Sequence, residues 1–256
     1  MSDSAIRIEV AGGVGRLILD SPPLNVLTIP VIEQAIEALG RLEADAGVKV
    51  IAFQAGGDKA FSAGVDVADH TPEKMAHMLE SFDTLCLGLH RSPKPTVAVV
   101  KRMALGGGCE VAACCDLVVA SDQATFGQPE IKVGVFPILG VALFPAMLGA
   151  KAANEIILTG ATYSAEEAQR LGLVNRVYAD DSFDADAERY LTGLARNSGV
   201  VLRCTKKAIL AGLGRSADEA LRVAGEIYVT ELMVTEDANE GLQAFLEKRR
   251  PVWKEA

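Results

Sequence analysis

The spacing of apolar residues in the N-terminal half of the chain predicts strands that alternate with helices. Residues 6–10 alternate polar and apolar side chains, and residues 14–19 resume the alternation after two glycines, so the two segments are predicted to form a hairpin. A helix is predicted from Ile29, because Thr28 can cap it and Pro30 suits a first helical turn. The chain therefore begins with a hairpin followed by a helix.

Three further apolar segments are predicted to form buried strands, over residues 48–53, 96–100 and 116–120. A helix predicted over residues 72–90 separates the first two of them, and another helix precedes the third. Strands that alternate with helices favour stacked βαβ units around largely parallel sheets. The N-terminal part of the chain is therefore assigned to the α/β class.

The C-terminal part is predicted to be almost entirely helical. Ser164 and Glu167 have the spacing of a capping box, which predicts a helix that starts there. Residues 174–178 could form one short strand. Further amphipathic helices are predicted over residues 184–197, 201–213, 217–230 and 238–248.

The 256 residues fit one large domain or two small ones, and no linker or low-complexity tract divides them. We predict a core over residues 1–195 and a helical C-terminal region over residues 196–256. With 25 Lys and Arg against 34 Asp and Glu, the formal charge is −9. This balance argues against a general nucleic-acid binder, which would need clustered cations to neutralise phosphates.

The cysteines and the apolar stretches indicate the compartment. The five cysteines are odd in number and include the neighbours Cys114 and Cys115, which is not typical of a disulfide framework, and no metal-ligand spacing is present. The N-terminus has no basic segment followed by an apolar run, and no apolar stretch is long enough to span a membrane. We therefore expect a cytoplasmic protein that holds no metal and has no membrane partner.

Two glycine-rich turns, over residues 61–66 and 106–110, each follow a predicted strand and precede a helix. Such turns expose backbone N–H groups at a helix N-terminus, where developing negative charge is stabilised. If the two turns face each other, their amides could hold one oxyanion. Taken alone, either turn is weak evidence for such a site and is better explained as a tight connection that allows close packing.

Two glutamates accompany these turns. Glu110 follows the triple glycine within an apolar run, and Glu130 follows Pro129, 20 residues later. Each could simply be an acid in the first turn of a helix, where it interacts favourably with the dipole. Two carboxyl groups beside an oxyanion hole could also manage one water molecule and one proton transfer, as hydration next to a carbonyl group requires.

Taken together, residues 60–66, 104–110 and 128–130 closely resemble the crotonase (enoyl-CoA hydratase/isomerase) superfamily, and the resemblance extends from residues 23–25 to residues 245–249. It implies an α/β fold with a crotonase-like spiral of ββα turns and a C-terminal helical trimerisation region. It also implies a homotrimer or a hexamer built as a dimer of trimers. The implied substrates are acyl-CoA thioesters, with coenzyme A as part of the substrate and no prosthetic group.

The resemblance also implies the catalytic positions. The backbone N–H groups of Val65 and Gly107 would form the oxyanion hole for the thioester carbonyl. Glu110 would orient and deprotonate water, and Glu130 would deliver the proton to carbon. Isomerases of the superfamily commonly keep only the acid that matches Glu130, so the pair favours hydration. The CoA-binding positions implied are Leu24, Asn25, Ala63, Gly64, Phe245 and Lys248, the last two beside CoA bound in a neighbouring subunit.

One departure from the ordinary hydratases bears on the acyl group. Residues 135–142 read Val-Phe-Pro-Ile-Leu-Gly-Val-Ala, where ordinary members have Pro-Gly-Ala-Gly-Gly. This segment and residues 62–74 resemble hydratases of anaerobic aromatic degradation, which convert cyclohexa-1,5-diene-1-carbonyl-CoA to 6-hydroxycyclohex-1-ene-1-carbonyl-CoA. The alternatives are an ordinary short-chain enoyl-CoA hydratase, an enoyl-CoA isomerase and a non-catalytic acyl-CoA binder.

Overall fold

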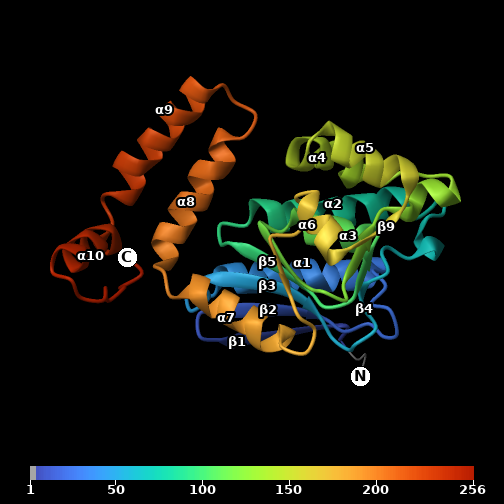
Figure 1. The fold of residues 1–256 in the computed structure, drawn as a ribbon, viewed down its shortest axis with the longest axis horizontal. Coiled ribbons are helices and arrows are strands. Elements are labelled where there is room, and N and C mark those ends of the chain that lie inside the picture. The colour runs from blue at the N-terminus through green and yellow to red at the C-terminus, as the bar shows by residue number, and fades with distance from the viewer. Residues whose placement is uncertain (1–3) are drawn as a thin grey trace.

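The computed structural model describes residues 4–256, and its first part repeats an order of two strands and one helix (Figure 1). The first three repeats are β1 (Ile6–Ala11), β2 (Val14–Leu19), α1 (Ile29–Ala44); β3 (Val50–Ala55), β4 (Ala60–Ser62), α2 (Met75–Arg91); and β5 (Thr96–Val100), β6 (Met103–Leu105), α3 (Gly107–Cys114). A short 3-10 helix, η1 (Val67–Asp69), lies between β4 and α2.

The fourth repeat is longer, because several short elements follow its strands. The elements are β7 (Leu117–Ser121), β8 (Thr125–Gly127), the 3-10 helix η2 (Pro129–Val133), α4 (Ile138–Leu148), α5 (Ala150–Thr159), β9 (Thr162–Ser164), α6 (Ala165–Arg170), β10 (Arg176–Tyr178) and α7 (Phe183–Ala195). Ser164 caps α6 with both hydrogen bonds of a capping box, as its spacing from Glu167 predicts.

The repeats build two sheets. The larger sheet has the order β1-β2-β3-β5-β7-β10 and is parallel except for the β1–β2 hairpin. The smaller sheet has the order β4-β6-β8-β9, with only β9 antiparallel. From the second repeat to the fourth, the first strand joins the larger sheet and the second strand joins the smaller one. This arrangement is the expected ββα spiral and confirms the prediction of an α/β core with largely parallel sheets.

Helices cover both faces of the larger sheet. On one face α1, α2 and α3 pack into the main apolar core, which includes Leu17, Phe53 and Phe82. On the other face α7 covers a smaller apolar cluster through Phe183 and Leu191. All eight residues of α3 are buried, so this helix runs through the centre of the core.

Four helical elements project from the core as an arm (Figure 1). They are α8 (Gly199–Gly212), α9 (Ala217–Ile227), the π-helical turn η3 (Tyr228–Leu232) and α10 (Glu236–Leu246). The residues that precede α8, α9 and α10 are Ser198, Ser216 and Thr235, and each accepts a backbone N–H from the first helical turn. The division between residues 1–195 and 196–256 stays a prediction. Within the described chain, no helix combines the length and apolar character that crossing a membrane requires.

The observed elements differ from the predicted ones where they are short. The C-terminal part is mostly helical and contains the predicted short strand as β10, but it also contains a second strand, β9, which pairs with β8. The predicted helix over residues 217–230 is α-helical only to Ile227 and then widens into η3. β4, β6 and β8 have three residues each. Three residues are too few to display the alternation that identifies a strand in a sequence.

Candidate active site

The two glycine-rich turns meet at the N-terminus of α3. A Cβ atom placed on Gly107 would lie 3.2 Å from the backbone nitrogen of Val65, and one on Gly64 would lie 3.2 Å from the nitrogen of Gly107. Gly64 and Gly106 have φ angles of +103° and +54°, which glycine adopts without strain. Within residues 4–256 neither the Val65 nor the Gly107 N–H donates a hydrogen bond. Two neighbouring free donors of this kind can bind one oxyanion.

The first turn is held by the loop that precedes α1. The backbone N–H of Ala63 donates to the carbonyl of Leu24 at 3.0 Å, and Leu27 donates to the carbonyl of Gly64 at 2.9 Å. Asp66 in turn donates to the carbonyl of Leu27 at 3.1 Å. The residues on both sides of Val65 are therefore fixed through main-chain hydrogen bonds, which keeps its N–H oriented.

Asn25 strengthens this connection from inside. Its side chain is 3% exposed, and its Nδ2 atom donates to the carbonyls of Gly56 and Ala60 at 3.0 and 2.8 Å. Ser62 Oγ donates to the Asn25 carbonyl and accepts the N–H of Gly64. The Asn25 side chain is therefore a support for the turn, while Leu24 next to it is 37% exposed. Direct contact of these two residues with CoA stays a prediction.

Glu110 lies in the first turn of α3 and is 4% exposed. Its Oε1 atom accepts the backbone N–H of Gly140, in the first turn of α4, at 2.8 Å. Burial raises the pKa of this carboxyl to about 7, and the charges of Glu130 and Asp83 add to the increase. At neutral pH the group therefore exchanges a proton readily in either direction.

Glu130 lies in η2 on the other side of the second turn. A Cβ atom on Gly106 would approach its Oε1 atom to 2.8 Å, so the carboxyl group rests against the backbone of that turn. The side-chain nitrogen of Gln128, a fully buried residue, donates to Oε1 and Oε2 at 3.0 and 3.1 Å when the amide is oriented to satisfy both partners. Burial raises the pKa of Glu130 as well, although the charge of His70 opposes the increase.

The site therefore combines two free backbone donors with two carboxyl groups that hold their protons more tightly than in water. The donors can stabilise negative charge on a carbonyl oxygen. Burial is the main cause that raises the pKa of both carboxyl groups, and for Glu110 the pKa of about 7 lets the group act as an acid or a base near neutral pH. This chemistry fits the movement of a proton and a water molecule next to a thioester.

Nearby polar residues have structural roles. Asp66 caps η1 by accepting the N–H of Ala68 at 3.0 Å. Asp69 accepts the N–H of Ile29 at 3.0 Å, which caps α1, and forms an ion pair with Lys74 at 2.8 Å. No group of three His, Cys, Asp or Glu side chains in the described part of the chain is placed to hold a metal ion.

The core positions singled out from the sequence, Val65, Gly107, Glu110 and Glu130, lie together in the structure. The predicted CoA-binding positions Phe245 and Lys248 lie far away, at the end of α10 on the arm. Phe245 is 82% exposed, so it is free to contact another chain. Sequence reasoning missed the roles of Gln128 and Gly140, because their hydrogen bonds to the glutamates depend on loop geometry.

Comparison with known proteins agrees with this geometry. The profile of the family described as enoyl-CoA hydratase/isomerase matches residues 9–256. A probable enoyl-CoA hydratase of Mycobacterium tuberculosis is 35% identical over 98% of both chains. The cyclohexa-1,5-dienecarbonyl-CoA hydratase of Thauera aromatica is 34% identical over 97% of this chain and 96% of its own. The crystal structure of an enoyl-CoA hydratase from Bacillus anthracis superposes with a TM-score of 0.94 at 29% identity, covering 98% of this chain and 100% of the other.

Proposed function

We propose that the glutamate pair of this chain adds water reversibly to a conjugated acyl-CoA thioester. The chain belongs to the enoyl-CoA hydratase/isomerase family and is an enzyme of the hydro-lyase type. The observation that carries this proposal is the juxtaposition of two free N–H donors with two carboxyl groups, of which Glu110 is buried and Glu130 is partly buried. Val65 and Gly107 donate to the thioester oxygen and stabilise the enolate that forms there.

The two glutamates divide the proton transfers. Glu110, as the carboxylate, takes a proton from water while the water oxygen bonds to the β carbon. The electron pair of the double bond moves to the thioester oxygen as an enolate. Glu130 then gives its proton to carbon, and the enolate returns to a thioester. The hydrogen bond from Gly140 keeps the Glu110 carboxyl directed into the site.

For the acyl group, we propose a cyclic dienoyl thioester such as cyclohexa-1,5-diene-1-carbonyl-CoA. Support comes from Ile138 and Val141, bulky aliphatic residues that lie beside Gly140 at the start of α4 and are 42% and 46% exposed. The Thauera aromatica relative bears the name of that activity. A 1,4-addition puts the hydroxyl on the β carbon and the proton on the γ carbon, so Glu130 must reach further along the ring.

The experiment supplies cyclohexa-1,5-diene-1-carbonyl-CoA and crotonyl-CoA separately and follows the absorbance of the conjugated thioester. Turnover of the cyclic substrate is expected. Turnover of crotonyl-CoA alone would assign the chain to ordinary short-chain hydration, the second candidate, which is the activity in the name of a Clostridium acetobutylicum relative. Binding of both thioesters with no turnover would refute hydration. A reaction in isotope-labelled water separates hydration from isomerisation, because only hydration incorporates the oxygen of water into the product.

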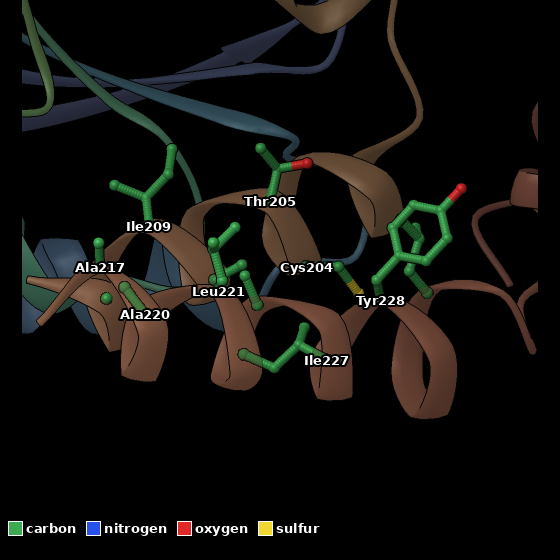
Figure 2. A pocket seen from close by; sticks show the side chains of 12 residues that line it. Cys204, Thr205, Ile209, Ala217, Ala220, Leu221, Ile227 and Tyr228 are labelled. Carbon is green, nitrogen blue, oxygen red and sulfur yellow. The ribbon is translucent and has the colours of Figure 1, made fainter. Parts of the chain in front are cut away.

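We also propose that the chain assembles as a homotrimer, alone or as a pair of trimers. An apolar groove runs between α8 and α9, with Ile209, Leu221 and Tyr228 along it (Figure 2). Leu221 is 72% exposed in the single chain, and covering such a surface with another copy removes apolar area from water. In that assembly Phe245 and Lys248 of one copy would contact CoA in the next. Light scattering at several protein concentrations tests the assembly.

A further inference from the structure

A second cavity, of about 470 Å³, lies between the core and the arm. On the core side it is lined by the end of α2 and the turn after it, and on the arm side by α8 and η3. Its charged lining residues are Arg91, Arg203, Lys206, Lys207 and Glu231. The volume falls within the range of small-molecule sites.

The cavity has an excess of positive charge in a chain whose formal charge is −9. Lys206 is buried and pairs with Asp116 at 2.6 Å, and Lys207 pairs with Glu231 at 2.6 Å. Within residues 4–256 neither Arg91 nor Arg203 pairs with a carboxylate or donates a side-chain hydrogen bond. Two arginines without a carboxylate partner thus line one cavity, Arg91 from the core and Arg203 from the arm.

Neighbouring groups respond to this charge. The pKa of Lys94, held by the carbonyls of Leu42 and Asp45, is lowered by burial and then by the charge of Arg203. The pKa of His90 is lowered by burial, and the charges of Lys206 and Arg91 lower it further against an opposing effect of Asp116. The positive field therefore extends to the core wall of the cavity.

We propose that this cavity binds a small phosphate-bearing anion, with Arg91 and Arg203 as its ligands. The planar guanidinium group matches phosphate oxygens in a two-point geometry, and such charge-assisted hydrogen bonds are among the strong ones. The bound anion connects the end of α2 to α8 and so fastens the arm to the core (Figure 1).

The cavity is separate from the hydration site. Its buried wall residue Lys206 binds Asp116, which follows the C-terminal end of α3, whereas the oxyanion turn lies at the N-terminus of the same helix. Eight residues of α-helix separate the two ends by roughly 12 Å. The anion site and the acyl site can therefore be filled together, and the proposal does not depend on which acyl group is hydrated.

Calorimetric titration of the full-length protein with sodium pyrophosphate, at constant ionic strength, tests the proposal. Pyrophosphate is expected to bind, with and without saturating CoA. The double variant Arg91→Gln/Arg203→Gln is expected to bind at least about tenfold more weakly, because each arginine supplies a charged hydrogen bond. The matched control is Arg222→Gln, which removes an exposed arginine of α9 and should leave the affinity unchanged.

Hydration activity of the double variant verifies that it is folded, since neither arginine belongs to the catalytic machinery. If the double variant does not fold, each single variant should weaken binding about threefold or more. Absence of pyrophosphate binding, equal affinity in the double variant, equal loss in Arg222→Gln, or displacement by CoA would each overturn the proposal.

Discussion

Replacing Glu110 with glutamine should make the protein more stable and at the same time inactive. Glutamine keeps an oxygen that can accept the Gly140 N–H, but it has no charge to bury. The wild-type carboxyl has a pKa of about 7 in the folded protein and 4.5 as its ordinary value. The native state therefore binds the proton more tightly than the unfolded chain does, and wild-type stability falls as the pH rises through this interval.

The size of the effect follows from these two values. Below pH 4.5 both states hold the proton, and the carboxyl carries no ionisation penalty. The penalty is about 1 kcal/mol at about pH 5.5 and about 3 kcal/mol at about pH 8.5, where both states are ionised. The stability advantage of Glu110→Gln should therefore grow by about 2 kcal/mol between these pH values.

Urea unfolding at fixed protomer concentration measures this difference at both pH values. The control is Glu80→Gln, which changes an exposed glutamate of α2 and should show no such trend. The hydration rate of Glu110→Gln should fall more than about a hundredfold, the scale of a general base. A variant that is less stable than wild type at the higher pH, or whose advantage does not change with pH, would refute the reasoning.

Three further results are expected. Gly107→Ala should lower kcat at least about a hundredfold, because its Cβ would approach the Val65 side chain to 2.8 Å at the oxyanion turn. The control is Gly193→Ala, which has open space around the new Cβ. Equal kcat values for the two variants would contradict the assignment. Asp83→Asn should move the acidic limb of the pH–rate profile to lower pH, because its negative charge raises the pKa of the buried glutamate of α3; an unmoved limb would argue against this coupling. Lys206→Met should destabilise the fold by about 3 kcal/mol in the same urea assay, since it leaves the Asp116 carboxylate without its buried partner. Lys207→Met removes only an exposed ion pair and should cost less than about 1 kcal/mol.

The order of strands and helices was predictable because its signals are local. The glycines at 12 and 13 mark the hairpin turn, Pro30 marks the start of α1, and the Ser164–Glu167 spacing marks α6. The smaller sheet was not predictable in this way. Its strands pair over two or three residues, and their position depends on the stacking of successive repeats, which no local pattern records.

The site was predictable in part for the same reason. The glycine-rich turns and the two glutamates within apolar or proline-containing segments are recognisable in the sequence, and the resemblance to a family implied their roles. The supporting contacts do not stand out. Gly140 reaches Glu110 across 30 positions of the chain, and the Asn25 amide reaches Ala60 across 35. These partners are selected by the packing of different repeats, so they appear only when the chain is folded.

The complete burial of α3 limits how this protein can change its chemistry over time. A substitution in α3 alters the packing of the main core and the wall of the site together, so few such changes leave a folded protein. The segment over residues 131–136 is exposed along its whole length and carries little packing. Substitutions can therefore accumulate there at small cost in stability, while the glutamate in α3 and its supports remain as they are.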